Sequence, residues 1–93
     1  MRLIYTEDAL ADLTRLRAFI AEKNPEAARR IGAELANRIE SIRAFPRMGW
    51  SVGKAPDPEV IRDFAFGKYV VRYAVHANTI AILRIWHHLE ERS

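Results

Sequence analysis

The residues best suited to chemistry lie in the apolar last third of the chain. Three arginines, Arg62, Arg72 and Arg84, stand among β-branched residues, and a Trp86-His87 pair follows. Metal-independent RNA cleavage needs a base for the 2′-hydroxyl, a cation for the charged transition state and an acid for the leaving oxygen. Arg62, Arg84 and His87 are therefore the catalytic candidates if the protein cuts RNA.

The spacing argues against a joint site for two of these candidates. Arg84 and His87 are three residues apart, so in a regular strand they face opposite sides, unless the strand bulges or ends near Trp86. The simpler alternative is structural: Arg84 pairs with a carboxylate, and His87 caps the end of the sheet.

Metal and cofactor chemistry find little support in the sequence. The chain has no cysteine, which excludes a disulfide and a thiolate zinc site. His87 and His88 are adjacent and point to opposite faces of a strand, and His76 belongs to a different strand. The four glycines are scattered and form no phosphate-binding loop. We expect neither a metal nor a cofactor.

Composition and charge favour one domain, residues 1–93, with an anionic partner. Residues 38–54 carry four basic side chains and one acidic, and residues 60–88 carry the same numbers, so each segment has a net charge of +3. Positive charge of this size suits nucleic acid or an acidic protein. The sequence shows no stretch long enough to span a membrane and no signal peptide, so we expect a cytoplasmic protein.

The first half of the chain predicts a strand and two helices. Residues Arg2–Tyr5 suit a short strand, and Thr6 can cap a helix over Thr6–Asn24. Asn24 followed by proline is a typical helix start, which predicts a second helix over Pro25–Ala44. Because the link between the helices is so short, they should form an antiparallel hairpin.

The second half predicts strands. After a loop at 46–59, which Trp50 is expected to anchor, apolar alternation indicates strands at Val60–Phe66, Tyr69–His76 and Thr79–Trp86. Short turns between them make an antiparallel meander. The predicted fold class is α+β, a helical hairpin packed on an antiparallel sheet in the order β-α-α-β-β-β. The place of the first strand in the sheet stays open.

The periodicity also predicts the core. In the last strand Ala81, Leu83 and Ile85 are expected on one face, and Leu83→Ala should cost about 2–5 kcal/mol. The residues expected to be largely buried are Leu13, Leu16, Ile20, Ile31, Leu35, Ile39, Val71, Tyr73, Val75, Leu83 and Ile85.

Six short motifs occur in order along nearly the whole chain. They are Ala9-x-x-Asp12-Leu13, Asn24-Pro25-Glu26-Ala27-Ala28, Phe45-Pro46-x-x-Gly49, Ile61-Arg62-Asp63-Phe64, Tyr69-Val70-Val71-x-Tyr73 and Ile82-Leu83-Arg84-Ile85-x-His87. In these motifs the chain resembles the ParE/RelE superfamily of bacterial type II toxins, and the ParE branch most closely. The resemblance implies a small toxin neutralised by a cognate antitoxin. It implies DNA gyrase as the target of ParE-like members and ribosome-bound mRNA as the target of RelE-like members.

One difference separates the two branches. The RelE branch typically carries an arginine after the aromatic residue that opens the third strand, whereas Val70 follows Tyr69 here. Loss of a cation from a phosphoryl-transfer site costs orders of magnitude in rate. We therefore favour a gyrase inhibitor that catalyses no reaction. The alternatives are a ribosome-dependent mRNA endoribonuclease and an inactive homologue that only binds antitoxin.

The same resemblance, with the apolar pattern, suggests contact surfaces. Leu10 and Phe19 widen the apolar stripe of the first helix beyond what one helix face needs, so we expect an acidic antitoxin to cover them. The residues expected to contact the target, gyrase or alternatively the ribosome and its mRNA, are Arg62, Arg84, Trp86 and His87.

Overall fold

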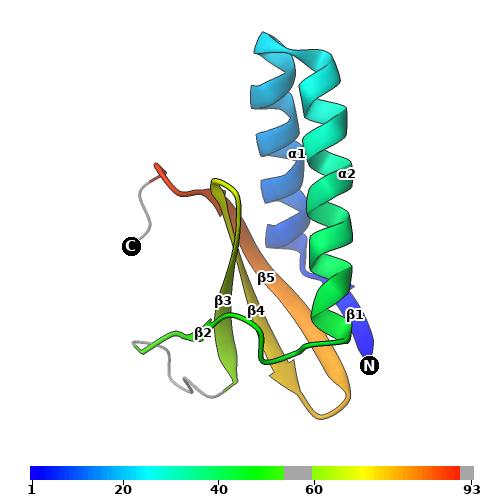
Figure 1. Ribbon diagram of the computed structural model, residues 1–93, viewed down its shortest axis with the longest axis vertical. Coiled ribbons are helices and arrows are strands. Elements are labelled where there is room, and N and C mark those ends of the chain that lie inside the picture. The colour runs from blue at the N-terminus through cyan, green and yellow to red at the C-terminus, as the bar shows by residue number, and fades with distance from the viewer. Residues whose placement is uncertain (54–59, 91–93) are drawn as a thin grey trace.

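The computed structural model describes residues 1–53 and 60–90, which form a helical hairpin and a five-stranded sheet (Figure 1). The predicted α+β class is confirmed. The elements are β1 (Arg2–Tyr5), α1 (Glu7–Lys23), α2 (Pro25–Glu40), a 3₁₀ turn (Ser41–Arg43), β2 (Trp50–Ser51), β3 (Ile61–Phe66), β4 (Tyr69–His76) and β5 (Thr79–His87).

The sheet is mixed, in the order β1-β5-β4-β3-β2. The three predicted strands form the antiparallel meander β3-β4-β5. The short β2 pairs with β3 inside the segment 46–59 predicted as loop, and the last part of that segment, 54–59, lies outside the described residues. The first strand, β1, pairs in parallel with β5, so it lies at the opposite edge from β2.

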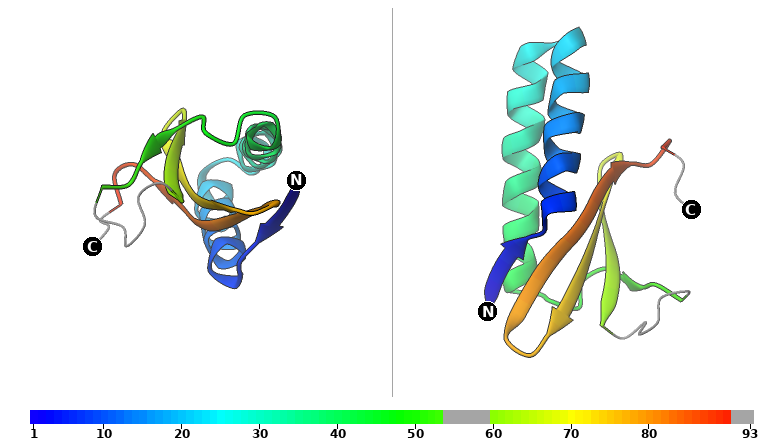
Figure 2. Two further views of the ribbon diagram at one scale, coloured as in Figure 1. Left: turned by 90° about the horizontal axis from the view of Figure 1, so that it is seen from below. Right: turned by 180° about the vertical axis from the view of Figure 1, so that it is seen from behind.

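Both helices begin where the sequence predicts them. Thr6 Oγ1 accepts a hydrogen bond from the backbone N–H of Ala9 at 3.1 Å, and Asn24 Oδ1 accepts one from that of Ala27 at 3.1 Å. The second helix ends at Glu40 rather than at Ala44, because the chain tightens into the 3₁₀ turn. The hairpin extends well past the end of the sheet (Figures 1 and 2).

The core lies between the sheet and the lower half of the hairpin. Six predicted core residues are buried: Leu16, Leu35, Ile39, Val71, Tyr73 and Ile85. Five are only partly buried: Leu13, Ile20, Ile31, Val75 and Leu83. Three residues outside the predicted core list, Ile42, Ile80 and Ile82, are fully enclosed.

A β-bulge explains the error in the last strand. In the register of the two strands, Arg72 of β4 lies opposite Arg84, but the next residue, Tyr73, lies opposite Ile82. Leu83 is therefore an extra residue in β5 with no residue opposite it in β4. A bulge shifts the side-chain alternation by one position. Ile80, Ile82 and Ile85 therefore all reach the core, and the prediction that grouped Leu83 with Ile85 is wrong.

Hydrogen bonds to backbone carbonyls hold the segment after α2 over the sheet. The Tyr73 hydroxyl donates to the carbonyl of Pro46 at 2.8 Å, and Arg62 donates to the carbonyls of Arg47 and Gly49 at 3.2 and 3.1 Å. Gly49 has a φ of +96°, and a Cβ there would collide with the Asp63 carbonyl. Trp50 is 51 % exposed, so the expectation that it anchors this loop is wrong.

The bulge yields a paired stability prediction. Ile82→Ala should lower the free energy of unfolding by about 2–5 kcal/mol, because Ile82 is fully enclosed in the core. Leu83→Ala should cost less than half as much, since the bulged side chain is partly exposed. Urea denaturation of the two variants provides the comparison, and equal losses would contradict the bulged register.

Candidate functional site

Helix α1 takes over the role of a neighbouring strand along β5. Pairing with β1 stops at the Tyr5–Ile82 pair, and among residues 1–53 and 60–90 no strand continues along the outer edge of β5 beyond it. The Thr6 hydroxyl lies within hydrogen-bond distance of the carbonyls of Ile82 and Leu83, at 2.9 and 3.1 Å. Asp12 accepts a hydrogen bond from the backbone N–H of Ile85 at 2.8 Å. Side chains of the helix thus satisfy the backbone of the strand.

Asp12 is the centre of a charged cluster at this edge. The residue is only 3 % exposed, and Arg84 donates to its carboxylate through Nε at 2.8 Å and Nη2 at 3.1 Å. Arg15 adds a third donor at 3.2 Å. Burial alone would raise the pKa of Asp12, but the hydrogen bonds from Arg84, from the Ile85 N–H and from Arg15 lower it below its ordinary value. The structural alternative for Arg84, pairing with a carboxylate, is therefore confirmed.

A second arginine is held in the same way on the neighbouring strands. Arg72 donates to both carboxylate oxygens of Asp63, at 2.8 and 3.0 Å, and its guanidinium lies 5.1 Å from the centre of the Trp86 ring. These hydrogen bonds to the Asp63 carboxylate raise the pKa of Arg72. Asp63 and Trp86 are 6 % and 8 % exposed. This cluster stabilises the sheet and leaves little of Trp86 open to a partner.

An apolar groove of about 500 Å³ lies between α1 and the end of the sheet. Its lining includes Phe19, Tyr69, His87 and Leu89, and Phe19 and Leu89 are 59 % and 78 % exposed. The His87 ring stands edge-on to Tyr69, with ring centres 5.4 Å apart. Burial raises the pKa of the Tyr69 hydroxyl. We call this surface, lined by Phe19, Tyr69, His87 and Leu89, the Phe19–His87 groove.

The C-terminal turn that closes the groove is tied to the Asp12 cluster. Glu90 accepts a hydrogen bond from the backbone N–H of His87 at 2.8 Å and forms an ion pair with Arg15. The backbone N–H of Leu89 donates to His87 Nδ1 at 3.2 Å. Since Arg15 also contacts Asp12, one set of charged contacts positions α1, β5 and the groove wall.

The structure brings together some of the predicted residues and separates others. Phe19 and His87 line one groove, but Leu10 lies nine residues from Phe19, about two and a half helical turns, and so on the opposite side of α1. In the sheet, Arg62 lies opposite Tyr73 and His87 lies opposite Tyr69, so the two are separated by four residues along β4. The Arg62 side chain binds loop carbonyls. The predicted target residues therefore do not form one cluster.

Sequence reasoning missed Asp12, Tyr69 and Glu90 as parts of this arrangement. Asp12 carried a usable signal, because it falls three residues after Ala9 and four before Leu16, on the apolar stripe of α1. A carboxylate at such a position needs a buried partner. Within residues 1–53 and 60–90 there is no group of three or more potential metal ligands.

The Asp12 cluster makes a specific stability prediction. Arg84, the backbone N–H of Ile85 and Arg15 all donate to the carboxylate, so an Asp12→Asn variant would turn an amide N–H₂ donor towards other donors. The substitution should lower the free energy of unfolding at pH 7 by about 1.5–3 kcal/mol, with the exposed Glu22→Gln as a nearly neutral control.

The Asp12 charge also predicts how the stability of the protein changes with pH. Because the folded-state pKa of Asp12 lies below the ordinary value of about 3.9, the stabilisation is present above that value and is lost as the pH falls through the folded pKa. Urea unfolding of wild type and Asp12→Asn should therefore converge at acid pH. A difference that persists unchanged at about pH 2 would contradict the role of the charge.

Comparisons with known proteins agree on one family. Residues 3–92 match the family model for the ParE toxin of the type II toxin-antitoxin system parDE. Two curated relatives from Caulobacter vibrioides are similar: Toxin RelE1 is 36 % identical over 90 % of this chain and 89 % of its own, and Toxin RelE2 is 33 % identical over 92 % and 93 %.

A solved structure shares the fold. The chain superposes with a TM-score of 0.76 on the chromosomal ParDE toxin-antitoxin system from P. aeruginosa, over 94 % of this chain and 95 % of the other, at 20 % identity. In the part of the chain that the structure describes, no helix is long and apolar enough to cross a membrane. By the family match and the curated relatives, this chain belongs to the ParE toxin family, within the ParE/RelE superfamily of type II toxins.

Proposed function

We propose that this type II toxin arrests growth by binding DNA gyrase and catalyses no reaction itself. The observation that carries the proposal is the engagement of the candidate cations. Arg84 is bound to Asp12, Arg72 to Asp63, and Arg62 to the carbonyls of Arg47 and Gly49. A phosphoryl-transfer site needs a cation directed at the developing charge, whereas these three arginines stabilise the protein's own structure.

The geometry of the histidines gives further support. His87 lies at the end of β5 with its Nδ1 accepting the N–H of Leu89 and its ring against Tyr69. General acid–base cleavage would require a second titratable group and a cation beside it. His88 stacks on His87 at 4.7 Å between ring centres and is exposed, but Arg15, which lines the groove with His87, is engaged by Asp12 and Glu90.

RNA cleavage remains the second candidate function for a specific reason. Three curated relatives at 31–36 % identity carry the name RelE, and the superfamily includes ribosome-dependent endoribonucleases. In that case Arg62, Arg84 and His87 would be the catalytic residues, and Arg84 would have to leave Asp12. The third candidate, an inactive homologue that only binds antitoxin, differs from both by the absence of growth arrest on expression.

The Phe19–His87 groove suggests how an antitoxin silences the toxin. An acidic antitoxin that covers the exposed Phe19 would also cover His87, one of the residues proposed to contact the target. To reach Leu10 as well, the antitoxin must pass around α1, because Leu10 lies on its other side. Neutralisation would then follow from competition for one surface. We expect the toxin in the cytoplasm, where it would meet gyrase or the ribosome.

Two assays run in parallel test the choice of target. Purified toxin should inhibit gyrase supercoiling and leave mRNA intact on programmed ribosomes. His87→Ala should weaken inhibition at least tenfold, whereas His76→Ala, at the exposed opposite end of β4, should behave as wild type.

The other outcomes of these assays are equally decisive. Cleaved mRNA with normal supercoiling would replace the gyrase proposal by the ribonuclease, and Arg84→Ala should then abolish cleavage. Neither effect, with no growth arrest on expression, would identify an inactive antitoxin-binding homologue.

A separate measurement tests the antitoxin surface. Phe19→Ser should weaken the complex with the cognate antitoxin at least tenfold, because an exposed aromatic side chain in a groove is a typical binding anchor. Leu10→Ser should weaken it less if the groove is the main contact. Unchanged affinity of both variants in isothermal titration would exclude both the Phe19 side and the Leu10 side of α1 as the interface.

A further inference from the structure

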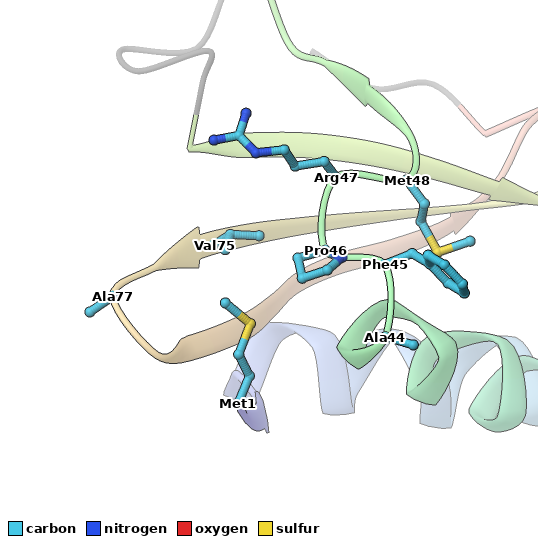
Figure 3. A pocket seen from close by; sticks show the side chains of 8 residues that line it. All are labelled: Met1, Ala44, Phe45, Pro46, Arg47, Met48, Val75 and Ala77. Atoms are coloured by element: carbon cyan, nitrogen blue, oxygen red, sulfur yellow. The ribbon is translucent and has the colours of Figure 1, made fainter.

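A cavity at the far end of the sheet from the Phe19–His87 groove is mainly apolar. It has a volume of about 790 Å³ and lies between the segment that follows α2 and the end of β4, where Phe45 and Val75 belong to its lining (Figure 3). Arg47 is the only charged residue among its eight described lining residues, and Figure 3 shows that side chain extending away from Met1 and Pro46. The groove between the two helices differs from this cavity, because it is bordered by two arginines.

These two arginines come one from each helix of the hairpin. Two hollows of about 320 and 360 Å³ lie between α1 and α2, and Arg17 and Arg29 line both of them. Arg17 comes seven residues after Leu10, so it lies on the Leu10 side of α1 and away from Phe19. We call the surface formed by the two hollows around Arg17 and Arg29 the Arg17–Arg29 groove.

The positive charge of this groove is not compensated within its lining. The described residues that line the two hollows include no aspartate and no glutamate. Among the residues that the structure describes, neither arginine forms a hydrogen bond or an ion pair, although Glu26 lies one turn before Arg29 on α2. Both arginines are exposed. Two such cations beside one groove are complementary to carboxylates.

Gly32 lies on the floor of the groove, in the middle of α2. Glycine in a helix interior is less stable than alanine, and only Gly49 and Gly67 among the described glycines have a positive φ. A Cβ at Gly32 would lie 3.7 Å from Arg17 Nε and 3.8 Å from its Cδ, which is ordinary van der Waals contact. The fold itself therefore does not require glycine here, and its effect is to leave the floor open to a closely packed partner.

The shape of the groove fits a helix. Its lining runs along α2 from Pro25 to Ile39, a length of about 21 Å at the helical rise, or roughly four turns. Small side chains at a contact allow two helices to approach closely. The apolar side chains of the floor are mostly of this kind: Leu13, Ala18, Ala21, Ala28, Ala33 and Ala36.

The charge of the whole hairpin favours a protein over a nucleic acid as the occupant. The helices α1 and α2 together carry six basic and seven acidic side chains, so the hairpin does not attract a polyanion over its length. The positive charge is local to Arg17 and Arg29, and the floor between them is apolar. This combination matches a helix with one apolar face and carboxylates at the border of that face.

We propose that the Arg17–Arg29 groove binds an acidic amphipathic helix of a partner protein. The helix packs its apolar face on the floor around Gly32, and carboxylates beside that face accept hydrogen bonds from Arg17 and Arg29. The groove lies on the other side of α1 from the Phe19–His87 groove, so the toxin has two separate binding surfaces. This inference does not depend on whether gyrase or mRNA is the target.

The test uses the full chain and two alanine-rich helical peptides of about sixteen residues, which is roughly four turns. In one peptide glutamates border an alanine face, and in the other lysines take their place. In an NMR titration, the glutamate peptide should shift the amide signals of Ala21, Gly32 and Ala33 and leave those of His87 and Leu89 in place. Binding should weaken as salt is added, because both arginines are exposed.

Arginine variants test the role of charge. Arg17→Gln combined with Arg29→Gln should weaken binding of the glutamate peptide at least tenfold, because both cations of the groove are lost. Arg30→Gln is the matched control, since Arg30 is exposed on α2, lies outside the described lining and has Glu26 and Glu34 one turn away on either side. The control should bind as wild type, and all of these variants should keep the wild-type melting temperature.

Glycine variants separate a binding role from a structural one. Gly32→Ala should raise the melting temperature of the free toxin, because alanine favours a helix, and yet weaken peptide binding at least threefold. Gly32→Leu, which fills the floor, should weaken binding at least tenfold. A glycine with only a structural role would not change stability and binding in opposite directions.

Five results would each overturn the proposal. They are no binding at millimolar glutamate peptide, equal binding of the lysine peptide, unchanged binding by the double arginine variant, unchanged binding by Gly32→Leu, and tighter binding of a DNA duplex than of the glutamate peptide at the same salt concentration.

Discussion

The buried carboxylate of Asp12 is the contact on which the arrangement of this molecule depends most. Pairing with β1 ends at Ile82, and Asp12 supplies the acceptor that the backbone of β5 needs beyond it. The same carboxylate binds Arg84 and Arg15, and Arg15 binds Glu90 in the C-terminal turn. Asp12 thus joins helix and strand directly and reaches the turn through Arg15, because a buried charge needs several donors around it.

This use of charge limits what the sheet can do chemically. The three arginines that would suit a ribonuclease bind Asp12, Asp63 and backbone carbonyls, so these three positive charges stabilise the fold. The ParE and RelE branches share a fold, and fold alone does not assign a target. Two exposed aromatic side chains, Phe19 and Phe45, each line a separate cavity, and these cavities lie at opposite ends of the sheet.

Hydrogen bonds from the sheet also position the segment after α2 that contains Phe45. Tyr73 is fully buried, yet its hydroxyl reaches the carbonyl of Pro46, and Arg62 binds the carbonyls of Arg47 and Gly49. Gly49 allows the close approach to Asp63 that this path requires. The core and the loop are therefore coupled through a few polar contacts, since the loop itself buries little apolar surface.

Local sequence determined the helices, their caps at Thr6 and Asn24, and the three-stranded meander, because caps, turns and apolar periods act between neighbours in the chain. Tertiary structure alone decided the place of β1, the bulge at Leu83 and the partners of Arg62. Those features depend on contacts between residues far apart in sequence, and periodicity within one strand carries no record of them. The bulge changes the alternation itself, which is why the predicted core face of β5 was right at Ile85 and wrong for the residues before the bulge, where Ile80 and Ile82 are buried instead of Ala81 and Leu83.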